Sequence, residues 1–309
     1  MEDITRQLKR PRNLIVVGLF GLAFIILVPQ LDSFKHALKT LNQGSLNYIL
    51  LAIALTFVTY LLSALVYKNL SFKALSFFKT SVVQFAAMFI NRLLPAGIGA
   101  IGVNYLYLRK NAHTKTQAGS VVAINNLVGA IGHNIIFWLL VIWSGYGLLN
   151  SRELTNPYGY LIFLLVLVLI IYFLYKFNPR FKRLFKDVLR QLKTYKKRPL
   201  KLFYALGFSV VLTLANVLAL YFSSKAFGIE LDFTKTFIVF TLGVSGGAIT
   251  PTPGGLGGFE AGLTAGYIAF GIEKEAALSA ALLYRLVSYW LTMIAGAGAF
   301  MFSLKKKWI

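Results

Sequence analysis

The chain has 309 residues, of which 57% are hydrophobic and only 14% are charged, and its mean hydropathy is +0.69. No soluble core could hide that much apolar surface, so the composition excludes a soluble globular protein and indicates an integral membrane protein. The formal net charge of +22 comes mainly from Lys and Arg in short loops beside apolar runs, a pattern typical of charges that orient a membrane protein, and we expect no nucleic-acid partner.

The first third of the chain predicts two full membrane spans followed by an interrupted one. A basic stretch at 1–12 precedes an apolar run at 13–30 with no small-residue cleavage site after it, so we expect an uncleaved span with its N-terminus in the cytoplasm. The second span is expected at 46–67. From 76 to 108, two shorter apolar pieces meet at Pro95 and the glycines that follow it. Because the loops on both sides are basic, both should be cytoplasmic, and the segment is predicted to be a re-entrant hairpin.

The middle of the chain predicts two more spans, at 117–149 and 158–175, which lead into the most basic loop, 176–201. In that loop, apolar residues recur at helical spacing while Lys and Arg occupy the other face. This pattern predicts an amphipathic helix at about 179–195 that lies on the anionic cytoplasmic leaflet.

The second half follows the same order as the first. A span at 202–224 precedes an interrupted segment at 234–271 and a last span at 276–304. The loops that flank the interrupted segment carry no net positive charge, so this second hairpin is predicted to open toward the outer side. Lysines after the last span place the C-terminus in the cytoplasm.

The two interrupted segments resemble each other. The stretch PAGIGAI, which begins at Pro95, matches PGGLGGF, which begins at Pro253, at an offset of 158 residues (253 − 95 = 158). The glycine motif alone could match by chance, but the same offset aligns the starts of neighbouring apolar segments. This favours a duplication, with repeats at about 46–149 and 202–304 in one membrane domain of residues 1–309. We therefore predict an all-α polytopic membrane protein with six full transmembrane spans plus two re-entrant helical hairpins in an inverted repeat, an architecture typical of alternating-access transporters.

Three charged residues fall at membrane depth, where charges usually face a cavity or a partner: Arg92, Glu260 and Arg285. We predict that the two arginines hold an anionic head group, because the planar guanidinium fork matches phosphate. Glu260 would then neutralise the empty site, recognise a cationic part of the substrate or carry a proton. The alternatives are that Glu260 only caps the helix after the glycine turn and that Arg92 reaches water from the hairpin tip.

Other residues complete the predicted substrate-binding site. Glycines at the two tips would let backbone N–H groups approach an anion closely. They are Gly97, Gly99, Gly255 and Gly257. Asn126 and Tyr284, from the spans beside the hairpins, are added to this set, although a packing role is the alternative for Tyr284.

Catalysis and cofactors have no support in the sequence. Cys is absent, the three His residues lie on separate segments, and there is no Walker A motif. We expect His133 to make a polar helix contact with Asn125, Asn126 or Asn134 rather than to bind a metal. No enzyme activity, metal or cofactor is therefore expected.

The motifs NRLLPAGIGAIG and PTPGGLGGFEAG, together with the basic central loop, resemble those of the flippase-like family named after the transmembrane region of lysylphosphatidylglycerol synthases. The resemblance covers nearly the whole chain, and the family's motif glutamate corresponds to Glu260. It implies a membrane region similar to a lipid flippase. In the two-part synthases a separate C-terminal cytosolic domain makes the aminoacyl lipid, and since that domain is missing here, the resemblance does not imply synthase activity.

These patterns predict a flippase or transporter in a prokaryotic inner membrane, with both termini in the cytoplasm. Its expected partners are anionic membrane lipids, either a phospholipid or a polyprenyl phosphate. Two other classes stay open: an H⁺- or Na⁺-coupled secondary transporter of a soluble organic anion, and a membrane scaffold that transports nothing. The sequence also leaves a homo-oligomer open.

Overall fold

A computed structural model describes residues 44–94, 97–143, 165, 168–169, 172–173, 175–195 and 199–309. The described residues form helices, with no strand among them. Four helices are long and apolar enough to cross a membrane: Leu46–Leu70, Lys115–Leu140, Pro199–Lys225 and Lys274–Lys305. They correspond to four of the predicted spans, while the predicted span at 13–30 and most of the one at 158–175 lie outside the described residues. The protein is therefore a multi-pass, membrane-embedded helical protein.

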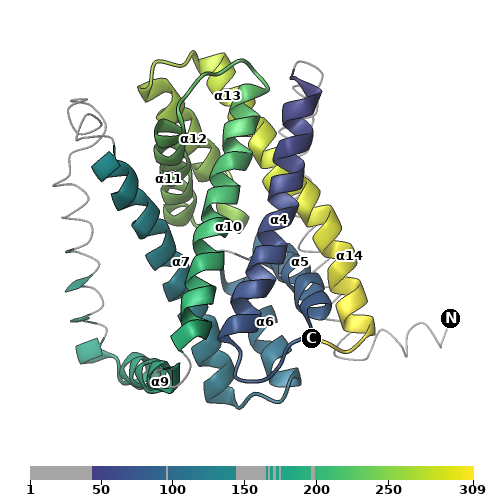
Figure 1. Ribbon diagram of the computed structural model, residues 1–309, viewed down its shortest axis with the longest axis vertical. Coiled ribbons are helices and arrows are strands. Elements are labelled where there is room, and N and C mark those ends of the chain that lie inside the picture. The colour runs from purple at the N-terminus through teal and green to yellow at the C-terminus, as the bar shows by residue number, and fades with distance from the viewer. Residues whose placement is uncertain are drawn as a thin grey trace.

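The first half contains a long helix, two short helices and a second long helix. They are α4 (Leu46–Leu70), α5 (Phe77–Leu93), α6 (Ile98–Lys110) and α7 (Lys115–Trp143). Helix α5 ends where the sequence predicts, because the residue before a proline avoids helical backbone, and Leu94 is extended with ψ of 143°. Gly97 then begins α6 with φ of 76°, a left-handed conformation that glycine adopts without strain. Helices α5 and α6 pack against each other in the lower half of the molecule (Figure 1).

The second half repeats this order of long, short, short and long. Its helices are α10 (Pro199–Lys225), α11 (Phe233–Ile249), α12 (Gly258–Ala269) and a last span made of α13 (Lys274–Arg285), η4 (Leu286–Leu291) and α14 (Thr292–Lys305). A short turn, η3 (Pro253–Gly255), joins α11 to α12, and η4 is a stretch of π-helix inside the last span. Helices α11 and α12 pack against each other in the upper half of Figure 1, at the opposite end from α5 and α6.

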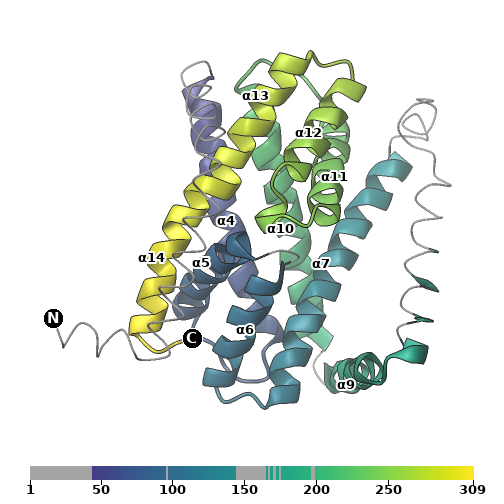
Figure 2. The same ribbon diagram turned by 180° about the vertical axis from the view of Figure 1, so that it is seen from behind.

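The two short helix pairs meet near the middle of the bundle. Figure 2 shows that the end of α5, the start of α6 and the turn between α11 and α12 all lie near mid-height. The turn η3 packs against α5, so the break of the second pair contacts the first pair. Around them, α4 packs along α10, and α14 packs along α5. The fold therefore brings interrupted backbone from both halves into one central region.

Glycines hold α11 and α12 close together. A Cβ atom at Gly246 would lie 2.2 Å from the carbonyl oxygen of Gly258, and one at Gly262 would lie 2.4 Å from the carbonyl oxygen of Leu242. No side chain fits at these distances, so the two backbones can approach only because both positions are glycine. We call this contact the glycine seam.

Helix α9 (Pro179–Tyr195) has the residue range predicted for the amphipathic helix. It lies at the lower end of the bundle (Figure 1). Its last residue, Tyr195, is buried and donates a hydrogen bond to the carbonyl of Leu70 at the end of α4. Its exposed basic side chains include Lys182, Arg183, Lys186, Arg190 and Lys193. A buried tyrosine thus anchors one end of a helix that carries these exposed basic side chains.

Candidate functional site

A cavity of about 580 Å³ lies where the two helix breaks meet. Its wall combines residues of the long helices α4, α7 and α10 with residues of both helix pairs. Amides and hydroxyls dominate its polar part: Thr56, Thr59, Ser63, Gln84, Asn91, Asn104, Asn125, Asn126 and Asn216. Among the described residues that line the cavity there is no Asp, Glu or Lys, and Arg92 and Arg285 carry its only formal charges. The wall is therefore cationic and rich in hydrogen-bonding groups.

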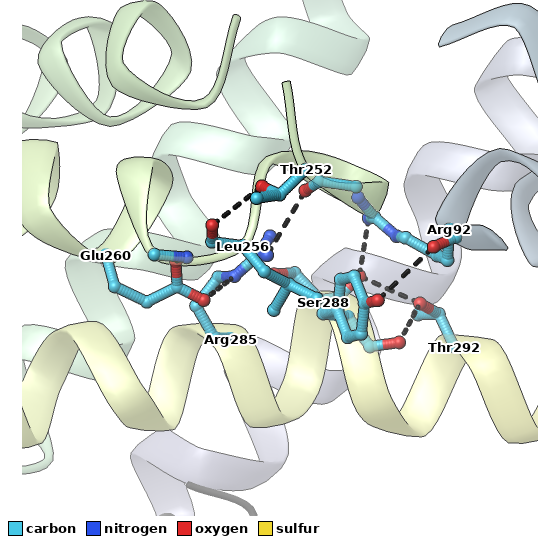
Figure 3. Close-up of polar contacts among 10 residues, drawn as sticks. Arg92, Thr252, Leu256, Glu260, Arg285, Ser288 and Thr292 are labelled. Atoms are coloured by element: carbon cyan, nitrogen blue, oxygen red, sulfur yellow. Dashed lines mark hydrogen bonds and ion pairs between the residues drawn. The ribbon is translucent and has the colours of Figure 1, made fainter. Parts of the chain in front are cut away.

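Arg285, at the end of α13, is only 3% exposed and pairs with Glu260 on α12. Its Nε donates to Oε1 of Glu260 over 2.6 Å, and its Nη2 donates to the carbonyl of Gly254 over 3.3 Å (Figure 3). The other carboxylate oxygen of Glu260 accepts a 2.8 Å hydrogen bond from the backbone N–H of Gly257. One carboxylate therefore caps its own helix and also neutralises a buried guanidinium, so the capping alternative describes only part of its contacts.

Arg92, near the end of α5, reaches the last span from the opposite helix pair. Its Nη2 donates to the carbonyl of Ser288 over 2.9 Å, and the same carbonyl accepts a 2.8 Å hydrogen bond from the hydroxyl of Thr292 (Figure 3). The Nε–H of Arg92 is buried and has no hydrogen-bond partner among the described residues. An unpaired buried donor is unfavourable, and it is free to bind an incoming acceptor.

Tyr289, in the π-helical segment η4, contacts both arginines. The guanidinium carbon of Arg92 lies 4.9 Å from its ring centre and that of Arg285 lies 4.6 Å from it, both within cation–π range. The phenol donates to the carbonyl of Arg92 over 3.4 Å, and the side chain is fully buried. Gly254 packs on the same ring, where a Cβ atom would lie 2.5 Å from Cε2 of Tyr289. A buried aromatic ring thus holds two cations close together, at a π-helical segment of the kind often found at functional sites.

The predicted site residues fall into two groups. Those that line the cavity are Arg92, Gly97, Asn126, Tyr284 and Arg285. Glu260 lies behind the wall, bound to Arg285. Gly99 and Gly255 pack closely against neighbouring backbone, and Gly257 gives its N–H to Glu260. Five of the nine predicted residues thus line one cavity, while three of the four predicted glycines serve helix packing and capping instead.

An amide network on the first helix pair was not anticipated from the sequence. Gln84 on α5 donates to Asn104 on α6 over 2.8 Å, and it accepts a 3.1 Å hydrogen bond from Ser63 on α4. Asn91 accepts a 3.3 Å hydrogen bond from the N–H of Ala100. We call these contacts the amide seam. The available signal was the presence of single amides in otherwise apolar helices, because a polar group at membrane depth needs a partner or a cavity.

His133 lies outside the cavity. Its Nε2 is 3.2 Å from the hydroxyl of Thr241 on α11, and its ring stacks on Phe237 with 5.0 Å between the ring centres. Its polar contact is therefore made to Thr241 on α11 and not to the predicted Asn125, Asn126 or Asn134. Within the described ranges, no group of three or more His, Asp or Glu side chains could hold a metal ion.

Residues 14–296 match the family model described as the lysylphosphatidylglycerol synthase TM region. The chain belongs to this family. A UPF0104 membrane protein of Pyrococcus horikoshii is 22% identical over 315 aligned positions, which cover 90% of this chain and 93% of that protein. A UPF0104 membrane protein of Methanothermobacter thermautotrophicus is 23% identical over 319 positions, which cover 93% of each chain.

One similar protein of the family carries an enzyme's name. A phosphatidylglycerol lysyltransferase of Bacillus subtilis is 35% identical to this family member over 95 positions, which cover 31% of this chain and 11% of that protein. Because the match covers so little of the lysyltransferase, lysyl transfer remains a property of that protein. The family description and this similarity link the chain to membrane proteins connected with lipids.

Proposed function

We propose that this member of the family carries the phosphate-bearing head group of an anionic lipid across the membrane, through the central cavity, while the acyl chains stay in the hydrocarbon. In this proposal the α5–α6 and α11–α12 pairs are re-entrant hairpins of an inverted repeat that open to opposite faces. The membrane is a prokaryotic inner membrane, with both chain ends in the cytoplasm. Membrane lipids are the partners, and no chemical step is involved.

The observation that carries this proposal is the pair of guanidinium groups on one polar cavity. A charge at the bilayer centre is disfavoured by about 2.5–3.5 kcal/mol on insertion scales, so two arginines at this depth need partners. Arg285 has one in Glu260, whereas Arg92 has no ion-pair partner among the described residues: it donates to the neutral carbonyl of Ser288, lies over the ring of Tyr289 and keeps an unpaired Nε–H. A phosphate oxygen is a stronger acceptor than a carbonyl, and guanidinium binds phosphate through two parallel N–H bonds. The site can therefore exchange a weak internal partner for a phosphate.

The rim of the cavity favours a lipid over a soluble anion. Ile101 on α6 and Asn126 on α7 line the cavity, and both are exposed. Beside them, the apolar side chains of Ile98 and Leu127 are 57% and 44% exposed. Among the described residues, the polar cavity thus reaches a surface covered by apolar side chains. Such a rim suits a molecule with a polar head and a hydrocarbon tail.

The proposal can be tested with purified protein in proteoliposomes that contain phosphatidylglycerol labelled on one acyl chain with a dithionite-sensitive fluorophore. The labelled lipid should become accessible to external dithionite beyond the share lost in protein-free vesicles, with or without an imposed H⁺ or Na⁺ gradient. Arg92→Gln should abolish this movement, and Arg92→Lys should keep part of it because the charge remains. Lys274→Gln is the matched control, since it removes one exposed positive charge that does not line the cavity.

The outcomes separate the site from the function. Transport by Arg92→Gln at the wild-type rate, in protein that unfolds at the wild-type temperature, would reject the assignment of the site. A folded wild-type protein that moves no anionic lipid under any gradient would reject the flippase. Uptake of a soluble organic anion by the same vesicles would favour the secondary transporter instead.

A further inference from the structure

The charges around the cavity favour a substrate of a particular net charge. Arg92 and Arg285 contribute two positive charges, and Glu260 contributes one negative charge through its contact with Arg285. No other Asp, Glu, Lys or Arg lines the cavity among the described residues. The empty site therefore carries one net positive charge in surroundings where an unbalanced charge is unfavourable. A ligand with a single negative charge would bring the site to neutrality.

Glu260 is not available to a cationic substrate. Its Oε1 accepts from Arg285 over 2.6 Å and its Oε2 accepts from the N–H of Gly257 over 2.8 Å, so each oxygen already has a partner. Its side chain is 17% exposed, and it does not belong to the cavity wall. An ammonium group in the cavity would therefore meet two arginines and no free carboxylate.

The rest of the wall suits hydroxyl groups. The side chains of Asn125 and Asn126 line the cavity and make no hydrogen bond to other described residues, and Asn126 is exposed. Among the described residues, Asn91 bonds only through its oxygen, to the N–H of Ala100, and Asn216 bonds only through its amide nitrogen, to the carbonyl of Leu212. The cavity thus offers amide donors and amide acceptors together. A hydroxyl both donates and accepts, so a polyol can satisfy both kinds of group, whereas an ammonium only donates.

From these two observations we propose that the transported head group is a phosphodiester whose second substituent is an uncharged polyol, such as glycerol, inositol or a sugar. Lipids that carry an aminoacyl group, and phosphomonoesters with two negative charges, are poor substrates. This inference rests on the proposed function and makes its substrate class narrower. It also predicts that the lysyl-bearing lipid in the family's name is a poor substrate of this chain, because the wall offers that lipid's ammonium groups no free acceptor carboxylate.

The experiment compares three lipids with the same labelled acyl chain in the proteoliposome assay: phosphatidylglycerol, lysyl-phosphatidylglycerol and phosphatidic acid. Phosphatidylglycerol should move at least about tenfold faster than either of the others, because each of them leaves an unbalanced charge in the cavity. Equal or faster movement of lysyl-phosphatidylglycerol would overturn the inference while leaving the flippase in place. No movement of any of the three would overturn the proposed function itself.

A charge-adding variant tests the same idea from the protein side. Asn126→Asp places a carboxylate on the cavity wall with almost no change of shape, so phosphatidylglycerol movement should fall and lysyl-phosphatidylglycerol movement should rise. Gln117→Glu is the matched control, since it adds the same charge on the same helix but away from the cavity, at a side-chain oxygen that already accepts from Thr114. If Asn126→Asp left the order of the lipids unchanged, the charge argument would be wrong.

A last experiment tests whether the ligand is a lipid head group or a free phosphodiester of the same chemistry. Radiolabelled glycerophosphoglycerol, which is the head group without acyl chains, is offered to the same vesicles. Exclusion of this compound together with movement of phosphatidylglycerol supports the lipid. Uptake of the compound without lipid movement would keep the polyol phosphodiester as the ligand and would overturn the flippase.

Discussion

Helices α5 and α11 are both 17 residues long, and each is followed by a shorter partner, of 13 residues in α6 and 12 in α12. The contacts that hold the two helices together nevertheless differ between the pairs. In the α11–α12 pair the glycine seam brings backbone against backbone, so that a Cβ at Gly246 would overlap a carbonyl. In the α5–α6 pair a Cβ at Gly99 would lie 2.4 Å from the carbonyl oxygen of Ile90, so the backbones touch beside the break. Farther along α6 the helices are joined by the amide seam, and Gly102 has nothing within 4 Å of its missing Cβ.

This difference explains why the cavity lies against the first pair. Backbones that touch leave no space between them, whereas helices joined through long amide side chains leave polar groups facing an opening. Gln84 and Asn104 of the amide seam both line the cavity. The second pair contributes the buried ion pair instead, through Glu260 and its contact with Arg285. One pair therefore supplies hydrogen-bonding capacity, and the other supplies a rigid, charged support.

The largest effect is expected from breaking the ion pair of the second helix pair. Glu260→Gln keeps an acceptor for the helix cap but leaves Arg285 buried without a counter-charge. The free energy of unfolding should fall by about 3–5 kcal/mol, because removing one partner of a buried pair leaves the other charge uncompensated. Thermal unfolding in detergent measures the loss as a drop in the transition temperature.

The matching double variant shows whether the two residues act as a pair. Glu260→Gln combined with Arg285→Met removes both charges, and it should recover most of the stability that Glu260→Gln loses. Losses that simply add in the double variant would mean that the pair is not coupled. The first helix pair has no equivalent, since the positions 158 residues earlier are Gly102 and Leu127.

The next effect comes from a single methyl group placed in each helix pair. Gly246→Ala puts a Cβ 2.2 Å from the carbonyl oxygen of Gly258, so two backbones must separate, and stability should fall by about 3 kcal/mol. Gly102→Ala, on an open helix surface, should instead raise stability by about 0.5–1 kcal/mol through helix propensity. The same unfolding measurement compares them. If Gly246→Ala and Gly102→Ala lowered the free energy of unfolding by similar amounts, the two helix pairs would not differ in how closely their backbones pack.

The breaks in the two pairs could be predicted because their signals are local. Pro95 forces Leu94 out of helical backbone, and the glycines after each proline supply the positive φ angles that begin α6 and precede α12. The four long helices could be predicted from apolar length alone. Signals of this kind depend on neighbouring residues only, so one sequence is enough to find them.

The contacts that build the site depend on distant residues, and the sequence could not supply them. Arg92 binds the carbonyl of Ser288, which is 196 residues away and lies within a π-helical segment, LVSYWL, whose composition does not distinguish it from an ordinary helix. Glu260 and Arg285 could be selected as charges at membrane depth, but their pairing depends on how α12 packs on α13. Charge at depth was therefore predictable, and the choice of partner was not.

The pH dependence of stability should differ between the loop that follows α6 and the loop that follows α12. His113, in the turn after α6, is buried, with Nε2 2.9 Å from the Ser71 hydroxyl and Nδ1 3.0 Å from the carbonyl of Leu108. Burial lowers its pKa below the ordinary 6.5; the backbone acceptors at Leu108 and Asn111 oppose this shift, and nearby Lys73 adds to it. The corresponding position after α12 is Gly271, which does not titrate.

The sign follows from the lowered pKa. The unfolded chain binds the proton more readily than the folded chain, so the stability that neutral His113 supports is complete above pH 6.5 and is lost as the pH falls below it. The loss can reach about 1.4 kcal/mol per pH unit for one proton. Unfolding followed between pH 7.5 and 5 should show a shallower acid loss in His113→Gln than in the wild type, and equal slopes would exclude His113 as the cause.

The smallest effect concerns the amide seam itself. Gln84→Leu or Asn104→Leu alone should destabilise the protein, because each leaves an amide of the partner without its 2.8 Å hydrogen bond. When both are replaced, the unpaired amide is gone, and the coupling energy between the two positions should be about 0.6 kcal/mol, the average for such contacts in membranes. The hydrogen bonds of such a weak seam can break at little cost. If the first pair is the one that moves during transport, the double variant should change the rate of lipid movement more than it changes the unfolding temperature. If the coupling energy between Gln84 and Asn104 were as large as that between Glu260 and Arg285, both helix pairs would be equally rigid. The first pair would then have no reason to be the one that moves.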